Sequence, residues 1–496
     1  MQARRGDLRT VWTIALGAAA FRLVVFLGLD LYADEAYYWT WSRRPAAGYF
    51  DHPPMVAWLI RASTALAPGE LGVRLLFLAC GALAVVFAAL VARELTEDRR
   101  APVIAALLAA TSPMLIFTGG LALPDAPVEA AYAASTWLVA RARREGWLVA
   151  GVAVGLALLS KYTAALLAPA LVLLVVLDPE LRAELRTPWP WLGGAVAVLL
   201  FLPNLLWNAT HGWVAVLFQI RHGLGSAATL RTFLEFLGGL LGGAGVVALP
   251  LGVWQLVRGR GSASIRVAAA TLAPVAVTAF SAFRGPVEAN WAALAYPALC
   301  GAAAVALVRL RPGPARWLVA GSAVLGVAAA IGFTLETRNP TLARPDAAIV
   351  ERFRGWPEYA RRARSAVERA CASAGSPAGC DPDDPFVFPA TYQEAAELAF
   401  YAGWNRFGPA SERPSQLDLW AAEPPVGGPF VTISPGPIPE RRRLFRAEGA
   451  GEPATFEVRM KGELLHGGHV QAWRAFLGPL ARRETDLHYL KDVPLR

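Results

Sequence analysis

The sequence predicts a polytopic α-helical membrane protein of about eleven spans, followed by a soluble α/β domain. The chain has 496 residues, of which 55% are hydrophobic and 17% charged, and this balance is too apolar for a soluble enzyme of its size. Apolar runs recur throughout residues 1–335. From Glu336 onward they stop, and Pro, Gly and charged residues become dense, which indicates a soluble domain over 336–496.

Eleven apolar runs are candidate spans. They cover approximately 11–31, 71–92, 102–122, 126–141, 147–161, 164–178, 191–206, 233–257, 266–283, 291–309 and 317–335. We expect the first run to be retained rather than cleaved as a signal peptide, because no small-x-small site precedes Asp34. The fifth and sixth runs are short and meet around Lys161, so they are either two spans or one long helix with a re-entrant piece.

The distribution of basic residues indicates the orientation. The net charge of +9 is spread over short clusters between the apolar runs, which is typical of topology signals and not of a nucleic-acid-binding surface. With the N-terminus inside, the greater part of these clusters falls on the inner side. This orientation places the loop 32–70 and the tail 336–496 outside the membrane.

The first external loop carries a concentration of ionisable and aromatic residues. Its ionisable residues are Asp34, Glu35, Asp51 and His52, and its aromatic residues include Tyr37 and Tyr49. Paired acids beside an imidazole and stacking rings suit acid/base or metal chemistry on a polar ligand. The alternative is that Asp34 caps a short helix starting at Glu35 and that the rings anchor the loop at the membrane interface.

Two single residues extend this candidate site. Asp125 lies in a Pro-Asp-Ala-Pro turn on the predicted outer face, level with the first-loop acids, although a helix cap is the alternative reading. Lys161 is one of three lysines in an arginine-rich chain, and an ammonium in or near a bilayer predicts a function such as phosphate binding. Snorkelling from a helix end is the alternative for Lys161.

A third external segment joins the ninth and tenth runs. It combines a guanidinium, a carboxylate, an amide and an indole: Arg284, Glu288, Asn290 and Trp291. Arginine suits bidentate phosphate binding, and tryptophan suits stacking on a sugar or anchoring at the interface. Charged residues within the runs, such as Arg22 and Glu129, are expected to pair inside the bundle, although a transporter would also place charges there.

The tail shows the patterns of a small α/β domain. Residues 386–388 and 430–433 read as buried strands, and 391–402 reads as a helix. Cys371 and Cys380 lie in the part predicted to be outside, where a disulfide between them is reasonable.

Five segments resemble bacterial family 39 glycosyltransferases, the protein-mannosyltransferase-like group of the GT-C superfamily, whose relatives include lipid A aminoarabinose transferases. They are Asp-Glu-Ala-Tyr-Tyr-Trp at 34–39, Gly-Tyr-Phe-Asp-His-Pro-Pro-Met at 48–55, Leu-Pro-Asp-Ala-Pro at 123–127, Gly-Leu-Ala-Leu-Leu-Ser-Lys-Tyr-Thr at 155–163 and Glu-Ala-Asn-Trp at 288–291. The first-loop motif is the most specific of them.

The resemblance implies a GT-C-like bacterial inner-membrane enzyme that takes a sugar from a polyprenyl-phosphate-linked donor and transfers it, with inversion, to a glycolipid, polysaccharide or protein acceptor outside. Asp34 would be the general base, oriented by Glu35 or Asp125. Lys161 and Arg284 would bind the departing phosphate. The implied substrate contacts are Tyr37, Tyr49, Asp51, His52, Glu288, Asn290 and Trp291.

The chain departs from the aminoarabinose transferases at Asp51-His52, where they have an acid-lysine pair, so the sugar and the acceptor stay open. Asp51 and His52 are also candidate ligands of a divalent metal ion, and no cofactor is otherwise expected. Membrane lipids are expected partners and nucleic acid is not. The alternatives are protein O-mannosylation, a secondary transporter or lipid flippase, and a scaffold that binds through the tail.

Overall fold

The computed structural model describes residues 2–224, 229–285, 287–341, 348–375, 380–410, 413–420, 424–437 and 445–479. The chain forms two compact units, which are described separately. The first contains 1–27, 52–207 and 219–332. The second contains 28–51, 208–218 and 333–496, so the first part of the predicted external loop belongs to the same unit as the tail.

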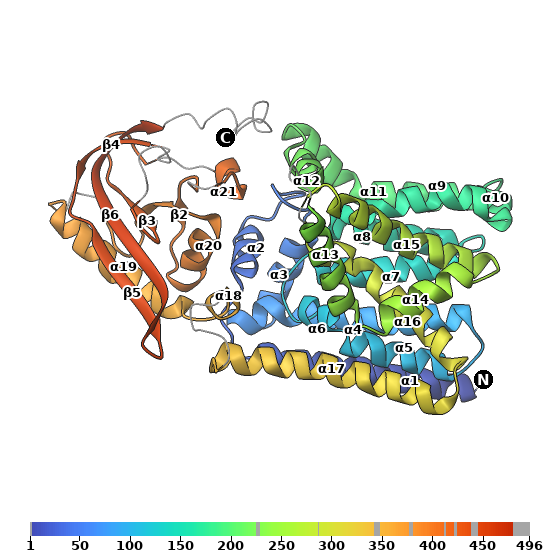
Figure 1. Ribbon diagram of the computed structural model, residues 1–496. Helices are drawn as coiled ribbons and strands as arrows, with labels where there is room; N and C mark the ends of the chain where they lie inside the picture. Colours follow the sequence, from blue (N-terminus) through green and yellow to red (C-terminus); the bar gives the residue numbers. More distant parts are fainter. Residues whose placement is uncertain are drawn as a thin grey trace. The chain divides into compact units, whose positions relative to one another are not determined.

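The first unit is helical throughout its described residues (Figure 1). Its elements are α1 (Gln2–Phe26), α3 (Met55–Thr64), α4 (Gly69–Leu95), α5 (Arg100–Thr111), α6 (Pro113–Thr118), α7 (Asp125–Arg141), α8 (Gly146–Ser160), the 3-10 helix η1 (Tyr162–Leu166), α9 (Leu167–Leu177), α10 (Pro179–Glu184), α13 (Leu230–Ala244), α14 (Ala248–Arg258), α15 (Ser262–Ala282), the 3-10 helix η2 (Ala289–Ala295) and α16 (Tyr296–Val308). Unit boundaries fall within α11 (Trp189–Thr210), α12 (Val214–Leu224) and α17 (Pro312–Arg338).

The helices confirm a polytopic membrane protein, but the number of full-length spans is lower than eleven. In the described part of the chain, six helices are long and apolar enough to cross a membrane, or seven if the bent pair α13 and α14 is one span. The runs predicted at 102–122, 126–141, 147–161 and 164–178 account for the difference. They fold as helices of 17 residues or fewer. Ser112 and Pro113 divide the run at 102–122 into α5 and α6, and Lys161 separates α8 from η1, whereas α7 matches its short predicted run.

Small residues allow the helices that carry site residues to pack closely. α7 packs against α4 and α8, and α8 packs against α11 at a crossing of two glycines. A Cβ atom added at Gly151 would lie 2.1 Å from the carbonyl oxygen of Gly193, so the two backbones are in direct contact there. α8, which is held by this contact, ends at Ser160 directly before Lys161.

The second unit contains a mixed sheet covered by helices (Figure 1). Its elements are α2 (Ala33–Arg43), α18 (Ala348–Glu351), α19 (Trp356–Ser373), β1 (Phe386–Pro389), α20 (Tyr392–Tyr401), β2 (Arg406–Phe407), α21 (Gln416–Leu419), β3 (Phe430–Ser434), β4 (Phe445–Ala450), β5 (Ala454–Met460) and β6 (Glu463–Pro479). The strand order is β2-β1-β3-β6-β4, and β5 also pairs with β6. The predicted strands at 386–388 and 430–433 and the helix at 391–402 are thus confirmed.

Three features hold the second unit together. β1 is parallel to β2 and β3, whereas β6 is antiparallel to its partners. α19 packs on β5 and β6, and a disulfide joins Cys371 near its end to Cys380, with the Cα atoms 6.0 Å apart. α2, from the first loop, packs on α20. This last contact explains why the motif around Asp34 belongs to the same unit as the tail.

Candidate active site

The first-loop acids occupy the start of α2 but have different partners. The helix begins at Ala33 with Tyr32 as its N-cap, so the reading of Asp34 as a cap is wrong. Glu35 is fully buried, and its Oε2 accepts a hydrogen bond from the Tyr32 backbone N–H at 3.0 Å, which fixes the helix start. Asp34 Oδ1 instead accepts a hydrogen bond from the Tyr392 hydroxyl at 3.4 Å.

Asp51 is the centre of a second group of contacts in the same unit. The hydroxyl of Tyr37 donates to Asp51 Oδ2 at 2.8 Å, and Arg413 Nη1 donates to Asp51 Oδ1 at 3.3 Å. The guanidinium of Arg413 also lies over the ring of Tyr392, 4.1 Å from its centroid. Asp34, Asp51 and Arg413 are therefore linked through the two tyrosines.

The environment of Asp34 makes its carboxylate a stronger base. Burial, followed by the negative charge of Asp51, raises the pKa of Asp34 to about 6. Arg413, the Tyr392 hydroxyl and Arg352 act in the opposite direction without cancelling this effect. A carboxylate with this pKa is ionised at neutral pH and accepts a proton more readily than an ordinary aspartate.

Tyr49 has a structural role in the first loop. It is fully buried and stacks on Trp41, with the ring centroids 4.5 Å apart. Its hydroxyl accepts a hydrogen bond from the Ala46 N–H at 2.9 Å and contacts the carbonyl of Trp41 at 3.1 Å. These contacts fix the position of the segment that joins α2 to Asp51.

In the first unit, which we call the membrane unit, the structure brings Asp125 and Lys161 together. Lys161 Nζ donates to Asp125 Oδ1 at 2.7 Å, and both side chains are buried. Asp125 begins α7 after Pro124 and makes no cap bond, so the cap reading is wrong here too. Lys161 has an extended backbone between α8 and η1, which confirms an interruption at this position. No second side-chain hydrogen bond joins either residue to the described part of the chain.

A further acid, Glu129, lies on α7, and a further base, Arg22, lies on α1. Glu129, one turn after Asp125 on α7, accepts a hydrogen bond from the Thr118 hydroxyl at 2.9 Å. Arg22 is fully buried, and its three guanidinium nitrogens have no hydrogen-bond partner among the described residues. The expectation that Arg22 and Glu129 pair inside the bundle therefore stays a prediction.

The third external segment lies at the start of η2, which packs against α7, α13 and α15. Arg284 is exposed and lies over the ring of Phe280 at 5.7 Å. Glu288 is exposed, and Asn290 and Trp291 are half-buried. The amide oxygen of Asn290 is buried and has no hydrogen-bond partner among the described residues. The roles predicted for these four residues stay predictions.

The metal hypothesis gains no support from a ligand cluster. In the ranges that the structure describes, no group of three or more His, Cys, Asp or Glu side chains is arranged to hold a metal ion. Both carboxylate oxygens of Asp51 already interact with Tyr37 or Arg413, and His52 is half-buried.

Sequence reasoning missed the contribution of the tail to this site. Tyr392, Arg413 and Gln416 come from segments more than 350 residues away from the first loop. Arg413 lies in a polar Arg-Pro-Ser-Gln stretch that carries no recognisable motif. The Tyr-Gln-Glu start of α20 was predicted as a helix, but its pattern does not indicate which loop it contacts.

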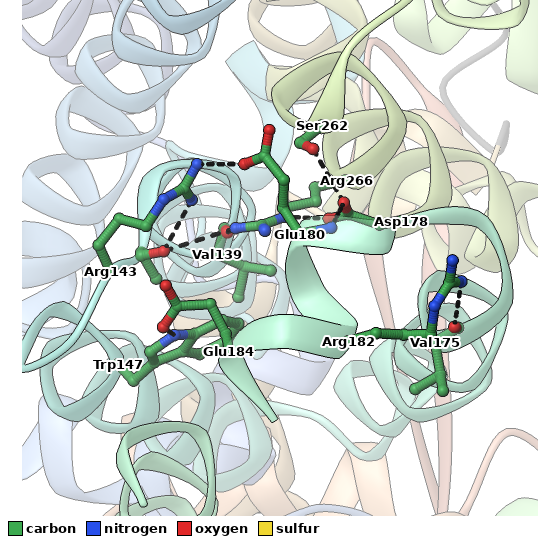
Figure 2. Close-up of polar contacts among 11 residues, drawn as sticks. Val139, Arg143, Trp147, Val175, Asp178, Glu180, Arg182, Glu184, Ser262 and Arg266 are labelled. Carbon is green, nitrogen blue, oxygen red and sulfur yellow. Dashed lines mark hydrogen bonds and ion pairs between the residues drawn. The ribbon is translucent and has the colours of Figure 1, made fainter. Parts of the chain in front are cut away.

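A second buried ion pair lies elsewhere in the membrane unit (Figure 2). Arg266 Nε donates to Asp178 Oδ2 at 2.5 Å, and both residues are fully buried. Asp178 Oδ1 accepts hydrogen bonds from the Ser262 hydroxyl at 2.8 Å and from the Glu180 N–H at 3.0 Å. Arg266 Nη1 donates to the Val139 carbonyl at 3.2 Å. The pair thus joins α7, α10 and α15.

Comparison with curated proteins gives relatives that are named as galacturonosyltransferases of lipid A or of the lipopolysaccharide core. The chain is 32% identical over 305 residues to the lipid A galacturonosyltransferase RgtD of Rhizobium johnstonii, a match that covers 58% of this chain and 63% of the relative. The match therefore spans less than two thirds of the length of that relative.

Solved structures share the fold over almost the whole chain. Apo ArnT from Cupriavidus metallidurans matches with a TM-score of 0.63 and 18% identity, covering 95% of this chain and 98% of ArnT. ArnT bound to undecaprenyl phosphate matches with a TM-score of 0.62 and 17% identity, covering 93% and 97%.

The family match coincides with part of the membrane unit. Residues 51–207 match the family described as dolichyl-phosphate-mannose-protein mannosyltransferase. This range includes His52, Asp125 and Lys161, three of the residues on which the resemblance was based. The family match is confined to residues 51–207, and over almost its whole length the chain is a polytopic membrane protein that shares its fold with ArnT.

Proposed function

We propose that the protein is a membrane glycosyltransferase that transfers a sugar from a polyprenyl-phosphate-linked donor to lipid A or to the lipopolysaccharide core, with inversion. The observation that carries this proposal is the buried pair of Asp125 and Lys161 at the interruption between α8 and η1. A buried ammonium with a single bonded carboxylate retains donor capacity for a phosphate. The undecaprenyl phosphate bound to ArnT supports the choice of carrier.

Asp34 is the proposed base. Its carboxylate removes the proton of the acceptor hydroxyl while the acceptor oxygen forms a bond to the anomeric carbon. The bond between that carbon and the phosphate oxygen breaks, and its electron pair leaves with the polyprenyl phosphate. Lys161, with Arg284 as a second cation, stabilises the charge on the leaving phosphate. Because phosphate is a good leaving group, positioning and charge neutralisation supply most of the rate.

Galacturonic acid is the sugar that the lipid A relative favours, since RgtD is a galacturonosyltransferase. Asp51-His52 stands where the aminoarabinose transferases that the chain resembles have an acid-lysine pair, which also separates this chain from them. A protein acceptor is the second candidate, because the family is described by its protein mannosyltransferases.

The proposed location is the bacterial inner membrane, with the N-terminus in the cytoplasm and the tail in the periplasm. The arginine clusters between the apolar runs support this orientation, and the disulfide of Cys371 and Cys380 suits an oxidising compartment. We further propose that residues 1–335 form the catalytic membrane domain and that residues 336–496 form a periplasmic domain that helps to select the acceptor.

The test is mass spectrometry of lipid A, core oligosaccharide and periplasmic proteins from cells with wild type, a deletion, Asp34→Asn or Lys161→Met at matched expression. We expect one sugar mass to disappear from lipid A or core in the deletion and in both variants. Arg143→Gln is the matched control, because Arg143 forms an exposed pair with Glu180. A sugar lost from proteins would change the acceptor, and an Asp34→Asn strain with the wild-type profile would remove Asp34 from the mechanism.

A further inference from the structure

We propose that Asp51 and Arg413 form a positioning pair that holds Asp34 in the first loop and controls the pH range in which it acts as a base. The inference rests on the proposed function and adds a role for the tail. Neither residue is assigned to the chemical step itself. Their effect passes through Tyr392 and through the charges that they place beside Asp34.

The first step of the argument is geometric. Arg413 contacts Asp51 through Nη1 and lies over the Tyr392 ring, and the hydroxyl of that ring donates to Asp34. The Arg413 side chain is 37% exposed, whereas that of Asp51 is 7% exposed. A buried carboxylate with a partly exposed guanidinium fixes the ring that contacts Asp34.

The second step concerns the tail segment that carries Arg413. The backbone N–H of Gln416 donates to the Tyr37 hydroxyl at 2.7 Å, and the same hydroxyl donates to Asp51. The Gln416 side-chain oxygen accepts the backbone N–H of Phe50 at 2.7 Å. Tyr37, Phe50 and Gln416 are all buried. Such a connected and satisfied network rigidifies the segment, so the position of Arg413 is defined.

The third step is electrostatic. Within the second unit, the charged and titratable groups that act on Asp34 are Asp51, Arg413, Tyr392 and Arg352. Asp51 raises the pKa of Asp34, and Arg413 lowers it. Removing either member of the pair therefore shifts the pKa of Asp34 in a predictable and opposite direction. A merely structural pair would not produce shifts of opposite sign.

The experiment is a pH profile of kcat/KM for purified full-length wild type, Asp51→Asn and Arg413→Gln, with polyprenyl-phosphate galacturonic acid and lipid A. We expect the acidic limb to move up by about half a pH unit in Arg413→Gln and down by about the same amount in Asp51→Asn. Arg413→Lys keeps the positive charge, so we expect the acidic limb of its profile to lie near the wild-type pH, although the stacking on Tyr392 is lost.

Two measurements keep the result interpretable. Arg361→Gln on α19 removes an exposed arginine paired with Glu358, and we expect it to leave the profile unchanged. The protonation of Asp34 is also followed directly by infrared difference titration, with Asp34→Asn as the blank. If wild type transfers no sugar, the proposed function fails, and the infrared titration still decides the inference. Shifts of the same sign, or no shift, in the two variants would overturn it.

Discussion

The described residues of the membrane unit include two buried acid–base pairs, and they differ in how many hydrogen bonds their polar atoms make. Asp178 and Arg266 have side-chain and backbone partners from α7, α10 and α15 (Figure 2). Asp125 and Lys161 bond to each other, and the described residues supply neither side chain with another hydrogen bond. All four residues of the two pairs are buried, so burial alone does not distinguish the pairs.

The difference teaches how to read charged residues in a helical membrane protein. Burial of an ion pair is costly unless further hydrogen bonds satisfy its lone pairs and protons. The Asp178–Arg266 pair comes close to that condition, with only Arg266 Nη2 lacking a partner among the described residues. It is therefore typical of a structural ion pair that stabilises the packing of helices. The Asp125–Lys161 pair makes fewer hydrogen bonds, which is expected of a site that receives an anion.

The largest effect is expected at Lys161. Lys161→Met removes the cation proposed to stabilise the leaving phosphate, and losing one such preorganised group lowers kcat by about 100-fold or more. Lys161→Arg keeps the charge but changes its geometry, so a partial loss is expected. Initial rates of sugar transfer to lipid A by the purified variants check this. If the rate of Lys161→Met were within twofold of the wild-type rate, the Asp125–Lys161 pair would have no special role in transfer, and its contrast with the Asp178–Arg266 pair would have no functional meaning.

The next effect is a loss of stability at Arg266. Arg266→Met leaves Asp178 as an unpaired buried charge, which costs about 3–5 kcal/mol. The double variant Asp178→Asn/Arg266→Met removes that charge, and we expect it to unfold at a higher temperature than the single variant. Thermal unfolding in detergent measures both. If the single and double variants unfold at the same temperature, the unpaired charge of Asp178 does not destabilise the fold, and the expectation is wrong.

The same contrast explains what the sequence could predict. Asp125 and Lys161 were both singled out, because Asp between prolines and a lone lysine in an arginine-rich chain are local signals. Asp178 and Arg266 were not, because they come from the ends of two apolar runs and look like ordinary loop charges. Partner identity depends on how the helices pack, and the apolar pattern of each helix does not encode it.

The limits in the fold have the same origin. Apolar runs located the membrane region, but four of them fold as helices shorter than a span. The first loop was recognised by its acids and rings, yet its partners Tyr392 and Arg413 come from the tail. Contacts between segments so distant in the sequence leave no local periodicity, so only the folded structure identifies them.

Asp34 provides a third case, in which function opposes stability. Its folded-state pKa of about 6 lies above the ordinary value of 3.8. The ionised form is therefore disfavoured in the folded protein, and the associated stability is present below pH 3.8 and lost as the pH rises through about 6. We expect Asp34→Asn to unfold at a higher temperature than wild type at pH 7.5. This difference should disappear near pH 4, which thermal unfolding at the two pH values measures.

The smallest effect is expected at the surface beside the Asp178–Arg266 pair. Arg143 and Glu180 form an ion pair whose side chains are 51% and 54% exposed (Figure 2). Exposed pairs contribute about 0–1 kcal/mol, because water screens the charges and ordering two long side chains costs entropy. Arg143→Gln should therefore unfold within about 1 kcal/mol of wild type and transfer sugar at the same rate. Glu180 also supplies a backbone N–H to Asp178, so a larger loss in Arg143→Gln would mean that the surface pair supports the buried one.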